Sequence, residues 1–385
     1  MRMQVTIEKA IALMDGYWLK RDLNNLKQVA LDVSQQKPDV AQAWRYLGIY
    51  GALNGDVVAE QFFHKAALLN DQESSTWLGV LNQYKHHNSG SLSAREILTQ
   101  VELEKLRLSR YMDFPAEVTI ETQAVCNAKC NFCPYPTMER QGEKMSDELI
   151  EKIIEDLKEV PSDLPFSISP FKVSDPFLDK RIFSILEKIN LSLPQGQLRL
   201  FTNGSPLTEK IIEKIALVQN VTHLWISLNE SDPVEYEKVM GLPFFKTIEK
   251  LDLLHQYVSE GYPHKVTLSR VVDSSHRDAA FSNFVSTRYP LFECFLIGRS
   301  DWTGQVNLDL NKKVPQTACG RWYELSIMAS GKVALCCMDG EGKYVVGDVN
   351  TDSVLNIYNS PDYRKMRQYT FTRLAAADPC TTCIT

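Results

Sequence analysis

The sequence lacks the features of several protein classes. No apolar run approaches the roughly 20 residues that span a bilayer, and the opening residues MRMQVTIEKA lack the apolar core of a signal peptide. The net charge of −6 provides no excess of Lys and Arg, which argues against a nucleic-acid backbone as the main partner. We therefore expect a cytoplasmic protein that binds neither a membrane nor nucleic acid.

Cysteine is absent from the first 125 residues, although the chain contains nine cysteines. Disulfide bonds are not expected, because the cytosol keeps thiols reduced. The cysteines are bunched instead, which is typical of metal or cluster ligation. Three lie within residues 126–133, Cys294 stands alone, and five lie near the end: Cys319, Cys336, Cys337, Cys380 and Cys383.

Residues 1–105 are predicted to form helices without strands. The sequence pattern around Asp22 recurs 34 residues later around Asp56, so that the two aspartates match. A generic helical bundle is the alternative to such repeats, which can form a concave surface for a protein partner or simply pack against the next domain. The pattern of a tetratricopeptide repeat, W-x2-L-G…A-x3-F…A, is followed by Trp44, Leu47, Gly48, Ala59, Phe63 and Ala66.

Residues 115–305 alternate strands with helices, which predicts an α/β domain with a parallel sheet, open or barrel-like. Amphipathic helices separate the strands, for example 146–160, where Ser146 is the expected N-cap. Six units fall short of the eight in a closed barrel, and in both architectures functional residues gather beyond the C-terminal ends of the strands. The six expected strands are 116–123, 165–171, 197–204, 222–229, 264–272 and 291–298.

Residues 315–385 form a small cysteine-rich region, for which we expect an α+β fold. The segment 323–340 predicts a hairpin that turns at Ser330 and Gly331, and the segment 353–368 is predicted to be helical.

Cys126, Cys130 and Cys133 have the spacing C-x3-C-x2-C. A [4Fe–4S] cluster takes one ligand per iron, usually four cysteine thiolates. Three cysteines leave one iron open for a substrate or cofactor, just as a catalytic zinc keeps an open position. The alternatives are a zinc knuckle, whose spacing and ligand count differ, and buried structural cysteines.

This stretch resembles the radical S-adenosylmethionine (SAM) superfamily, because aromatic Phe132 precedes the last cysteine and the motif follows the first strand of a βα domain. The resemblance implies a partial (β/α)6 barrel, a [4Fe–4S] cluster whose open iron binds SAM, and a reducing partner such as flavodoxin or ferredoxin. One electron would cleave SAM to methionine and a 5′-deoxyadenosyl radical, which removes hydrogen from the substrate.

Further segments resemble the cofactor-binding motifs of that superfamily. Its Gly-Glu-Pro turn after the second strand is replaced by Ser-Asp-Pro at residues 174–176, which keeps an acid before the proline but loses the glycine turn. The acid would hold the SAM amino group, and an arginine on the fifth strand would face the SAM carboxylate. The resemblance implies cofactor contacts by Phe132, Asp175, Asn203, Ser227, Asn229 and Arg270.

The cysteines of the tail resemble the first half of the SPASM domain, an extension of radical SAM enzymes that binds auxiliary [4Fe–4S] clusters. Two residues follow Cys383 in this sequence, which leaves four ligands and one auxiliary cluster, as in the shortened twitch domain. A structural zinc on the same cysteines is the alternative. The spacing Gly-x4-Cys favours Cys336 over Cys337, so that the implied ligands are Cys319, Cys336, Cys380 and Cys383.

An oxidoreductase follows from this resemblance, because an auxiliary cluster can accept one electron from a substrate radical. This resembles enzymes that dehydrogenate a sugar-like alcohol, such as the aminocyclitol dehydrogenase of aminoglycoside biosynthesis, so we expect dehydrogenation or epimerisation of a sugar or aminocyclitol. Arg299 and Asp301, after the sixth strand, are candidate acid–base groups or else lie in a solvated turn. Cys294 or Cys337 is a candidate hydrogen-atom donor, as in radical epimerases, although Cys294 is alternatively a buried core thiol.

Two other functions remain open. Relatives with SPASM domains also cross-link or epimerise ribosomal peptides, and the N-terminal repeats would then present the peptide. A winged-helix leader-binding domain is not evident in the sequence, which argues against this function. The second alternative is a non-catalytic iron–sulfur adaptor, which the altered Gly-Glu-Pro motif favours. The expected substrate is thus a small molecule or a peptide.

Overall fold

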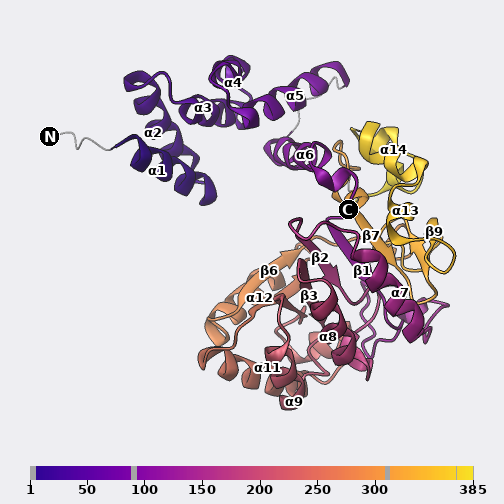
Figure 1. Cartoon of the computed structure of the whole chain (residues 1–385). Coiled ribbons are helices and arrows are strands. Elements are labelled where there is room, and N and C mark those ends of the chain that lie inside the picture. The colour runs from indigo at the N-terminus through magenta and orange to yellow at the C-terminus, as the bar shows by residue number, and fades with distance from the viewer. Residues whose placement is uncertain (1–5, 88–92, 308–312, 370, 385) are drawn as a thin grey trace. The chain divides into compact units, whose positions relative to one another are not determined.

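The computed structural model of the chain describes residues 6–87, 93–307, 313–369 and 371–384. These residues divide into two compact units (Figure 1). Unit 1 comprises the described residues up to Ser109 together with Gln316–Ala318, and unit 2 comprises the other described residues. The division into domains 1–105, 115–305 and 315–385 stays a prediction.

Unit 1 is helical in its described residues, as the sequence predicts. Its α6 begins with a capping box, in which the Ser93 side chain accepts from the Glu96 backbone and the Glu96 side chain accepts from the Ser93 backbone. Gly48 and Phe63 are in such close contact that a Cβ at Gly48 would lie 2.7 Å from the ring. The helices are α1 (Ile7–Leu19), α2 (Leu23–Gln36), α3 (Ala41–Leu53), α4 (Ala59–Leu68), α5 (Gln72–His87) and α6 (Ala94–Arg107).

The tetratricopeptide-like character of unit 1 stays a prediction. Its motif residues lie on the paired helices α3 and α4, and Phe63 stacks on Trp77 of α5 with ring centroids 5.3 Å apart. These contacts explain the spacing of small and large residues, since the glycine makes room for the ring of the following helix.

Unit 2 is built on a nine-stranded sheet in the order β6-β5-β4-β3-β2-β1-β7-β8-β9. Strands β1 to β7 pair in parallel, and β7, β8 and β9 pair in antiparallel fashion. All six predicted strands of the α/β region are confirmed. They are β1 (Glu117–Ile120), β2 (Phe166–Ser169), β3 (Gly196–Thr202), β4 (Val221–Ser227), β5 (Lys265–Val271) and β6 (Glu293–Ile297).

Helices alternate with these strands and cover the outer face of the sheet (Figure 1). Ser146 caps α7, as predicted, by accepting from the backbone of Leu149. On β4, Leu224 and Ile226 are fully buried, while Trp225 between them points to the opposite face. The helices are α7 (Asp147–Leu157), α8 (Ile182–Ser192), α9 (Glu209–Leu217), α10 (Pro233–Met240), α11 (Phe244–Ser259) and α12 (His276–Arg288).

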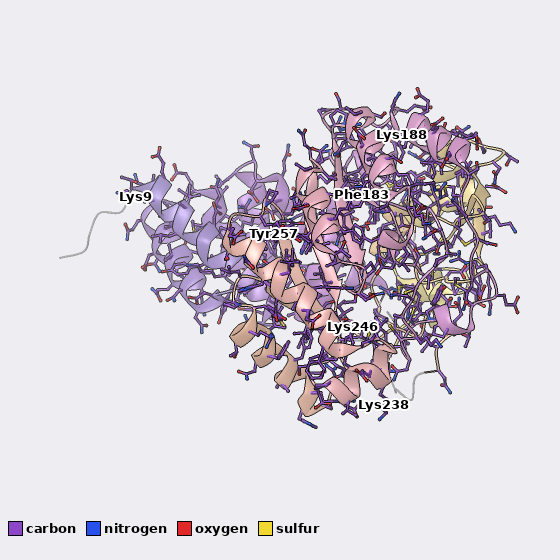
Figure 2. All side chains as sticks on the ribbon, turned by 90° about the horizontal axis from the view of Figure 1, so that it is seen from below. Lys9, Phe183, Lys188, Lys238, Lys246 and Tyr257 are labelled. Carbon is purple, nitrogen blue, oxygen red and sulfur yellow. The ribbon has the colours of Figure 1, made fainter. Side chains whose placement is uncertain are left out.

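The outer helices turn their polar faces to solvent. Figure 2 labels exposed Lys188 on α8, Lys238 on α10 and Lys246 on α11. None of the helices in the described part of the chain combines the length and apolarity that a membrane span requires.

The tail continues the sheet of the barrel, because β7 (Glu324–Ile327) pairs in parallel with β1. The predicted hairpin is confirmed: β8 (Lys332–Ala334) follows a turn in which Gly331 has φ of 91°, a conformation that favours glycine. The remaining elements are β9 (Val345–Asp348), α13 (Val354–Tyr358) and α14 (Pro361–Tyr369).

The predicted helical segment 353–368 is divided into α13 and α14. Pro361 begins the second helix, where its missing N–H costs nothing, and it disfavours helical backbone at the preceding residue. Short 3-10 helices complete the structure: η1 (Arg110–Met112), η2 (Tyr135–Thr137), η3 (Pro176–Leu178), η4 (Gly320–Tyr323), η5 (Arg373–Ala375) and η6 (Cys380–Thr382).

Candidate functional site

A cavity of about 520 Å³ lies inside the barrel of unit 2 and reaches the loop with the three clustered cysteines. Strand residues that point away from the outer helices line it, together with residues of the loops after β1, β2, β6 and β8. Of the residues proposed from the sequence, the lining includes Cys126, Phe132, Cys130, Cys133, Asp175, Asn203, Ser227, Asn229 and Cys337. Residues far apart in the sequence therefore meet in one site.

The cysteine loop is held from two sides. The backbone N–H groups of Lys129 and Asn131 donate to the carbonyls of Met240 and Val239 on α10, over 2.8 and 3.2 Å. Trp302, which follows β6, donates from its indole nitrogen to the Phe132 carbonyl over 2.9 Å. The loop is thereby fixed against α10 on one side and against the segment after β6 on the other.

The three cysteines are half-buried, and the partial burial of their thiols raises their pKa values. The pKa of Cys126 rises to about 11, that of Cys133 rises to about 12, and that of Cys130 lies well above its ordinary value. Bound metal ions reverse this preference, since coordination deprotonates a thiol. Three converging thiols at a cavity wall therefore fit an iron–sulfur cluster with one iron open to the cavity.

In the described residues, no group of three or more His, Cys, Asp or Glu side chains is arranged as the ligands of one metal ion. A [4Fe–4S] cluster places its thiolates on separate irons.

Asp175 is fully buried beside the cysteine loop, and burial raises its pKa to about 6. Its carboxylate accepts from the backbone of Phe177, the hydroxyl of Thr202 and the backbone of Asn203, at 3.2, 2.8 and 2.9 Å. Its own N–H donates to the Val125 carbonyl over 2.9 Å. These bonds fix the acid without the glycine turn of the usual motif.

Two asparagines are positioned by contacts with the cysteine loop and α10. The Asn203 amide donates to Asn127 over 2.8 Å and lies 3.8 Å from the Cys126 sulfur. Asn229, whose φ is 67°, accepts from the Val271 backbone over 2.9 Å and lies 3.2 Å from the Met240 sulfur. Both residues are therefore held in fixed orientations at the cavity wall.

Arg270 does not line this cavity. It is fully buried and forms ion pairs with Glu230, Asp273 and Asp278, the last two at 2.9 and 2.7 Å. It also donates to the Asn229 carbonyl. The arginine therefore holds the loop that presents Asn229, instead of facing the cavity itself.

The segment after β6 presents its alternate residues to the cavity. Gly298, Ser300 and Trp302 line it, whereas the candidates Arg299 and Asp301 do not. On β6 itself Phe295 and Ile297 line the cavity, so Cys294 points to the other face of the strand. Cys294 is exposed, with its sulfur 3.8 Å from the Ser282 hydroxyl, so the expectation of a buried core thiol is wrong.

Several cavity residues were not found from the sequence. The Arg199 guanidinium pairs with Glu117 at 2.8 Å, and that of Arg321 pairs with Glu324 at 3.0 Å. Lys172, from the loop after β2, also lines the cavity, and burial lowers its pKa. An aromatic wall is formed by Phe171, Phe201, Trp225 and Phe295, with consecutive ring centroids 4.4, 5.8 and 5.1 Å apart.

The tail cysteines form a second group. Electrostatic interactions link Cys319 to Cys336 and to Cys383. A further electrostatic interaction links Cys383 to Cys380. All nine cysteines are free thiols. The four predicted auxiliary ligands are thus neighbours, and their sulfur chemistry fits an iron–sulfur cluster.

Cys337 differs from these four by lining the cavity. A hydrogen bond with Cys336, together with the cations Arg321 and Lys172, lowers the pKa of Cys337 to about 6. Its neighbour Cys336 has a pKa well above its ordinary value, because of that same hydrogen bond and of burial.

Two family models match the chain. Residues 120–272 match the radical SAM superfamily. The chain carries a radical SAM domain. Residues 319–384 match the SPASM iron–sulfur cluster-binding domain, so the radical SAM domain is followed by a SPASM domain. No curated protein sequence matches the chain significantly.

Two solved structures share this fold, and a third is reported beside them. Streptococcus suis SuiB bound to its precursor peptide SuiA is 15% identical, with 81% of this chain and 80% of that chain covered and a TM-score of 0.53. The protein anSMEcpe with bound AdoMet is 14% identical, with coverage of 68% and 83% and a TM-score of 0.51. BtrN in complex with AdoMet and 2-DOIA is 15% identical, with coverage of 71% and 94% and a TM-score of 0.46.

Proposed function

We propose that the chain is a radical SAM oxidoreductase that abstracts hydrogen from its substrate and completes a redox modification with an auxiliary [4Fe–4S] cluster. The observation that supports this is the single cavity lined by Cys126, Cys130 and Cys133 and by Cys337 of the tail. A substrate in this cavity lies between both groups of cysteines. Electron transfer to the auxiliary cluster then needs no movement of the substrate.

When bound, a [4Fe–4S] cluster on three cysteines supplies one electron for the cleavage of SAM, which yields the 5′-deoxyadenosyl radical that removes hydrogen from the substrate. The residues of the chain bind and orient SAM. Asp175, whose pKa burial raises to about 6, would hold the SAM amino group, and Asn203, Ser227 and Asn229 would offer hydrogen bonds around it. The aromatic wall gives one side of the site an apolar surface.

The substrate is a sugar or aminocyclitol, which the enzyme dehydrogenates or epimerises. A wall of aromatic rings with few, well-placed polar groups is typical of small-molecule sites. Arg199, Glu117 and Arg321 line the cavity and provide both donors and an acceptor for hydroxyl and amino groups. For epimerisation, Cys337 in its thiol form is the hydrogen-atom donor, because it lines the cavity and Cys294 does not. Ligation of a cluster by Cys336 removes the Cys336 proton, and with it the hydrogen bond that lowers the pKa of Cys337.

Modification of a ribosomal peptide is the second candidate. Strand β6 is the edge of the sheet, and its residues Phe295 and Leu296 are 51% and 40% exposed. An extended peptide can add to such an edge. SuiB bound to SuiA has a similar fold and binds a precursor peptide. Conversion of a free sugar or aminocyclitol would exclude this candidate, and binding of a precursor peptide to the full chain would support it.

The test is formation of 5′-deoxyadenosine from SAM by anaerobically reconstituted protein with a strong reductant or reduced flavodoxin. We expect product from the wild type and from Cys294→Ala, a matched loss of one exposed thiol outside the cavity. We expect none from Cys130→Ala. Absence of product from wild type with a full iron load would contradict the proposal and favour the non-catalytic adaptor.

A further inference from the structure

Lys172 is a buried cation between the cavity and the tail cysteines. It lies in the loop after β2 and is 4% exposed. Its ammonium donates to the hydroxyl of Ser326 over 2.8 Å and to the carbonyls of Cys336 and Cys337, each over 3.2 Å. The lysine therefore joins the barrel directly to the segment that carries a predicted ligand of the auxiliary cluster.

The hydrogen bonds of Lys172 match its charged form. An ammonium has three N–H donors and no acceptor, and the nitrogen of Lys172 has three oxygen partners. A neutral amine would donate to both carbonyls and accept from the Ser326 hydroxyl. The ammonium, which is the ordinary form of a lysine, donates to all three oxygens.

The charge of Lys172 is not balanced by a carboxylate in contact with it. The other two cations of the cavity wall, Arg199 and Arg321, pair with Glu117 and Glu324. Within the described residues, no ion pair includes Lys172, and the nearby Glu121 pairs with Arg140. A buried charge costs several kcal/mol unless a negative group lies near it, and the thiols of Cys336 and Cys337 are close enough to act on Lys172.

A cluster held by four thiolates is such a group, because it bears net negative charge that increases on reduction. Charge and hydrogen bonds near the sulfurs are the means by which proteins set cluster potentials. A cation beside Cys336 favours the reduced cluster and raises its potential, as an acceptor of a substrate electron requires.

We propose that Lys172 is a positioning residue of the auxiliary cluster, which holds the Cys336–Cys337 segment and raises the reduction potential of the cluster. This inference rests on the proposed function, because it assumes that Cys319, Cys336, Cys380 and Cys383 bind that cluster.

The test measures the potential of the auxiliary cluster alone. In the full chain, changing Cys126, Cys130 and Cys133 together to Ala removes the cluster of the cysteine loop, and this triple variant is the parent. Its midpoint potential is followed by EPR during redox titration. It is compared with Lys172→Gln, Lys172→Met and the control Lys188→Gln, each made in the parent. Lys188 carries the same charge on the outer face of α8, where its side chain is 49% exposed (Figure 2).

We expect both Lys172 variants to shift the one-electron equilibrium at least tenfold toward the oxidised cluster, which is about 59 mV to more negative potential. Lys188→Gln should leave the potential unchanged. An unchanged potential in both Lys172 variants would overturn the inference. Loss of the cluster from both variants would overturn the claim that Lys172 sets the potential, since its effect would then be explained by its hold on the Cys336–Cys337 segment alone.

The iron content of the parent separates this inference from the proposed function. About four irons in the parent support the auxiliary ligand set, and the potentials then decide on Lys172. A parent without a cluster would show that the ligand set itself is wrong, and the inference would fall with it.

Discussion

Cys126, Cys130 and Cys133 all line the cavity, whereas of the five tail cysteines only Cys337 does. The first group lies on a loop beside Asp175 and Asn203, which also line the cavity. In the second group, the four predicted ligands of the auxiliary cluster lie close to one another and outside the cavity. The first site is therefore open to a bound molecule and the second is not. We propose that the loop site binds and cleaves SAM and that the tail site transfers electrons.

The largest expected effect separates these two roles. Cys133→Ala should reduce SAM cleavage to background, because it removes a ligand of the cluster that binds SAM. Cys383→Ala should leave uncoupled SAM cleavage within about threefold of wild type but stop oxidation of the substrate. Formation of 5′-deoxyadenosine and of oxidised product is measured for each variant.

The comparison would fail if Cys383→Ala lost SAM cleavage while it retained the iron of the loop cluster. The tail site would then take part in the first step and not only in the electron transfer that follows.

Adjacent Cys336 and Cys337 provide a sharper version of this comparison within one dipeptide. Cys336→Ala should lose about four irons per chain, since it removes a ligand of the closed site. Cys337→Ala should keep its full iron, because this thiol faces the cavity. Iron and sulfide analysis of both variants shows which cysteine is the cluster ligand. Iron loss from Cys337→Ala alone would make Cys337 the ligand instead of Cys336.

The stability of the contact between the barrel and the tail should depend on a buried ion pair. Glu121 is fully buried, pairs with Arg140, and accepts from the backbones of Val173 and Ala329, each over 3.2 Å. Breaking a buried pair from one side costs about 3–5 kcal/mol, so Glu121→Gln should lower the free energy of unfolding by that amount. Denaturant unfolding measures it.

Glu143 provides the control for this change. It faces the same arginine at 3.9 Å, but its side chain is 40% exposed. Glu143→Gln should therefore cost no more than about 1 kcal/mol. Equal losses in the two variants would show that Glu121 does not join the regions.

A smaller effect concerns pH. Burial raises the pKa of Asp175 to about 6, so the folded protein holds this proton more tightly than the unfolded chain. The carboxyl therefore destabilises the fold increasingly as pH rises from about 4 to 6, by roughly 3 kcal/mol in total. Relative to wild type, Asp175→Asn should gain stability over this window and remain constant above it.

Asp179 should show the opposite sign. Burial raises its pKa, but hydrogen bonds and charge from Arg181 outweigh this and hold the pKa below its usual range. Its contribution to stability is present above pH 4 and is lost as pH falls further. As pH rises toward 4, the wild type gains this contribution and Asp179→Asn does not. The variant should therefore lose stability relative to wild type over that range. Unfolding free energies between pH 3 and 8 test both variants, and a common sign would contradict this account.

The elements of unit 2 could be predicted because their signals are local. Each parallel strand is a short run of β-branched and aromatic residues between turn signals, and α7 has its cap in the sequence. The cysteines were found from their spacing. The division of the 353–368 segment had a signal too, in the proline at 361.

Other site residues have no local signal. Arg321 reaches the cavity only because β7 pairs with β1, a contact over some two hundred residues. Arg299 was predicted as a site residue because its side chain can act as an acid or base. The alternation of side chains after β6 instead turns Ser300 to the cavity, and the sequence does not show which of the two sets faces inward. Cys294 is exposed because β6 is an edge strand, and a strand's place in the sheet is a tertiary property.

The central claim is that one cluster binds SAM and the other does not. The most direct measurement is the EPR spectrum of the reduced wild-type protein with and without SAM, beside that of Cys133→Ala. We expect two cluster signals in the wild type, of which SAM changes one, and that signal should be missing from the variant. A SAM response in the signal that remains in Cys133→Ala, or no response in the wild type, would contradict the account.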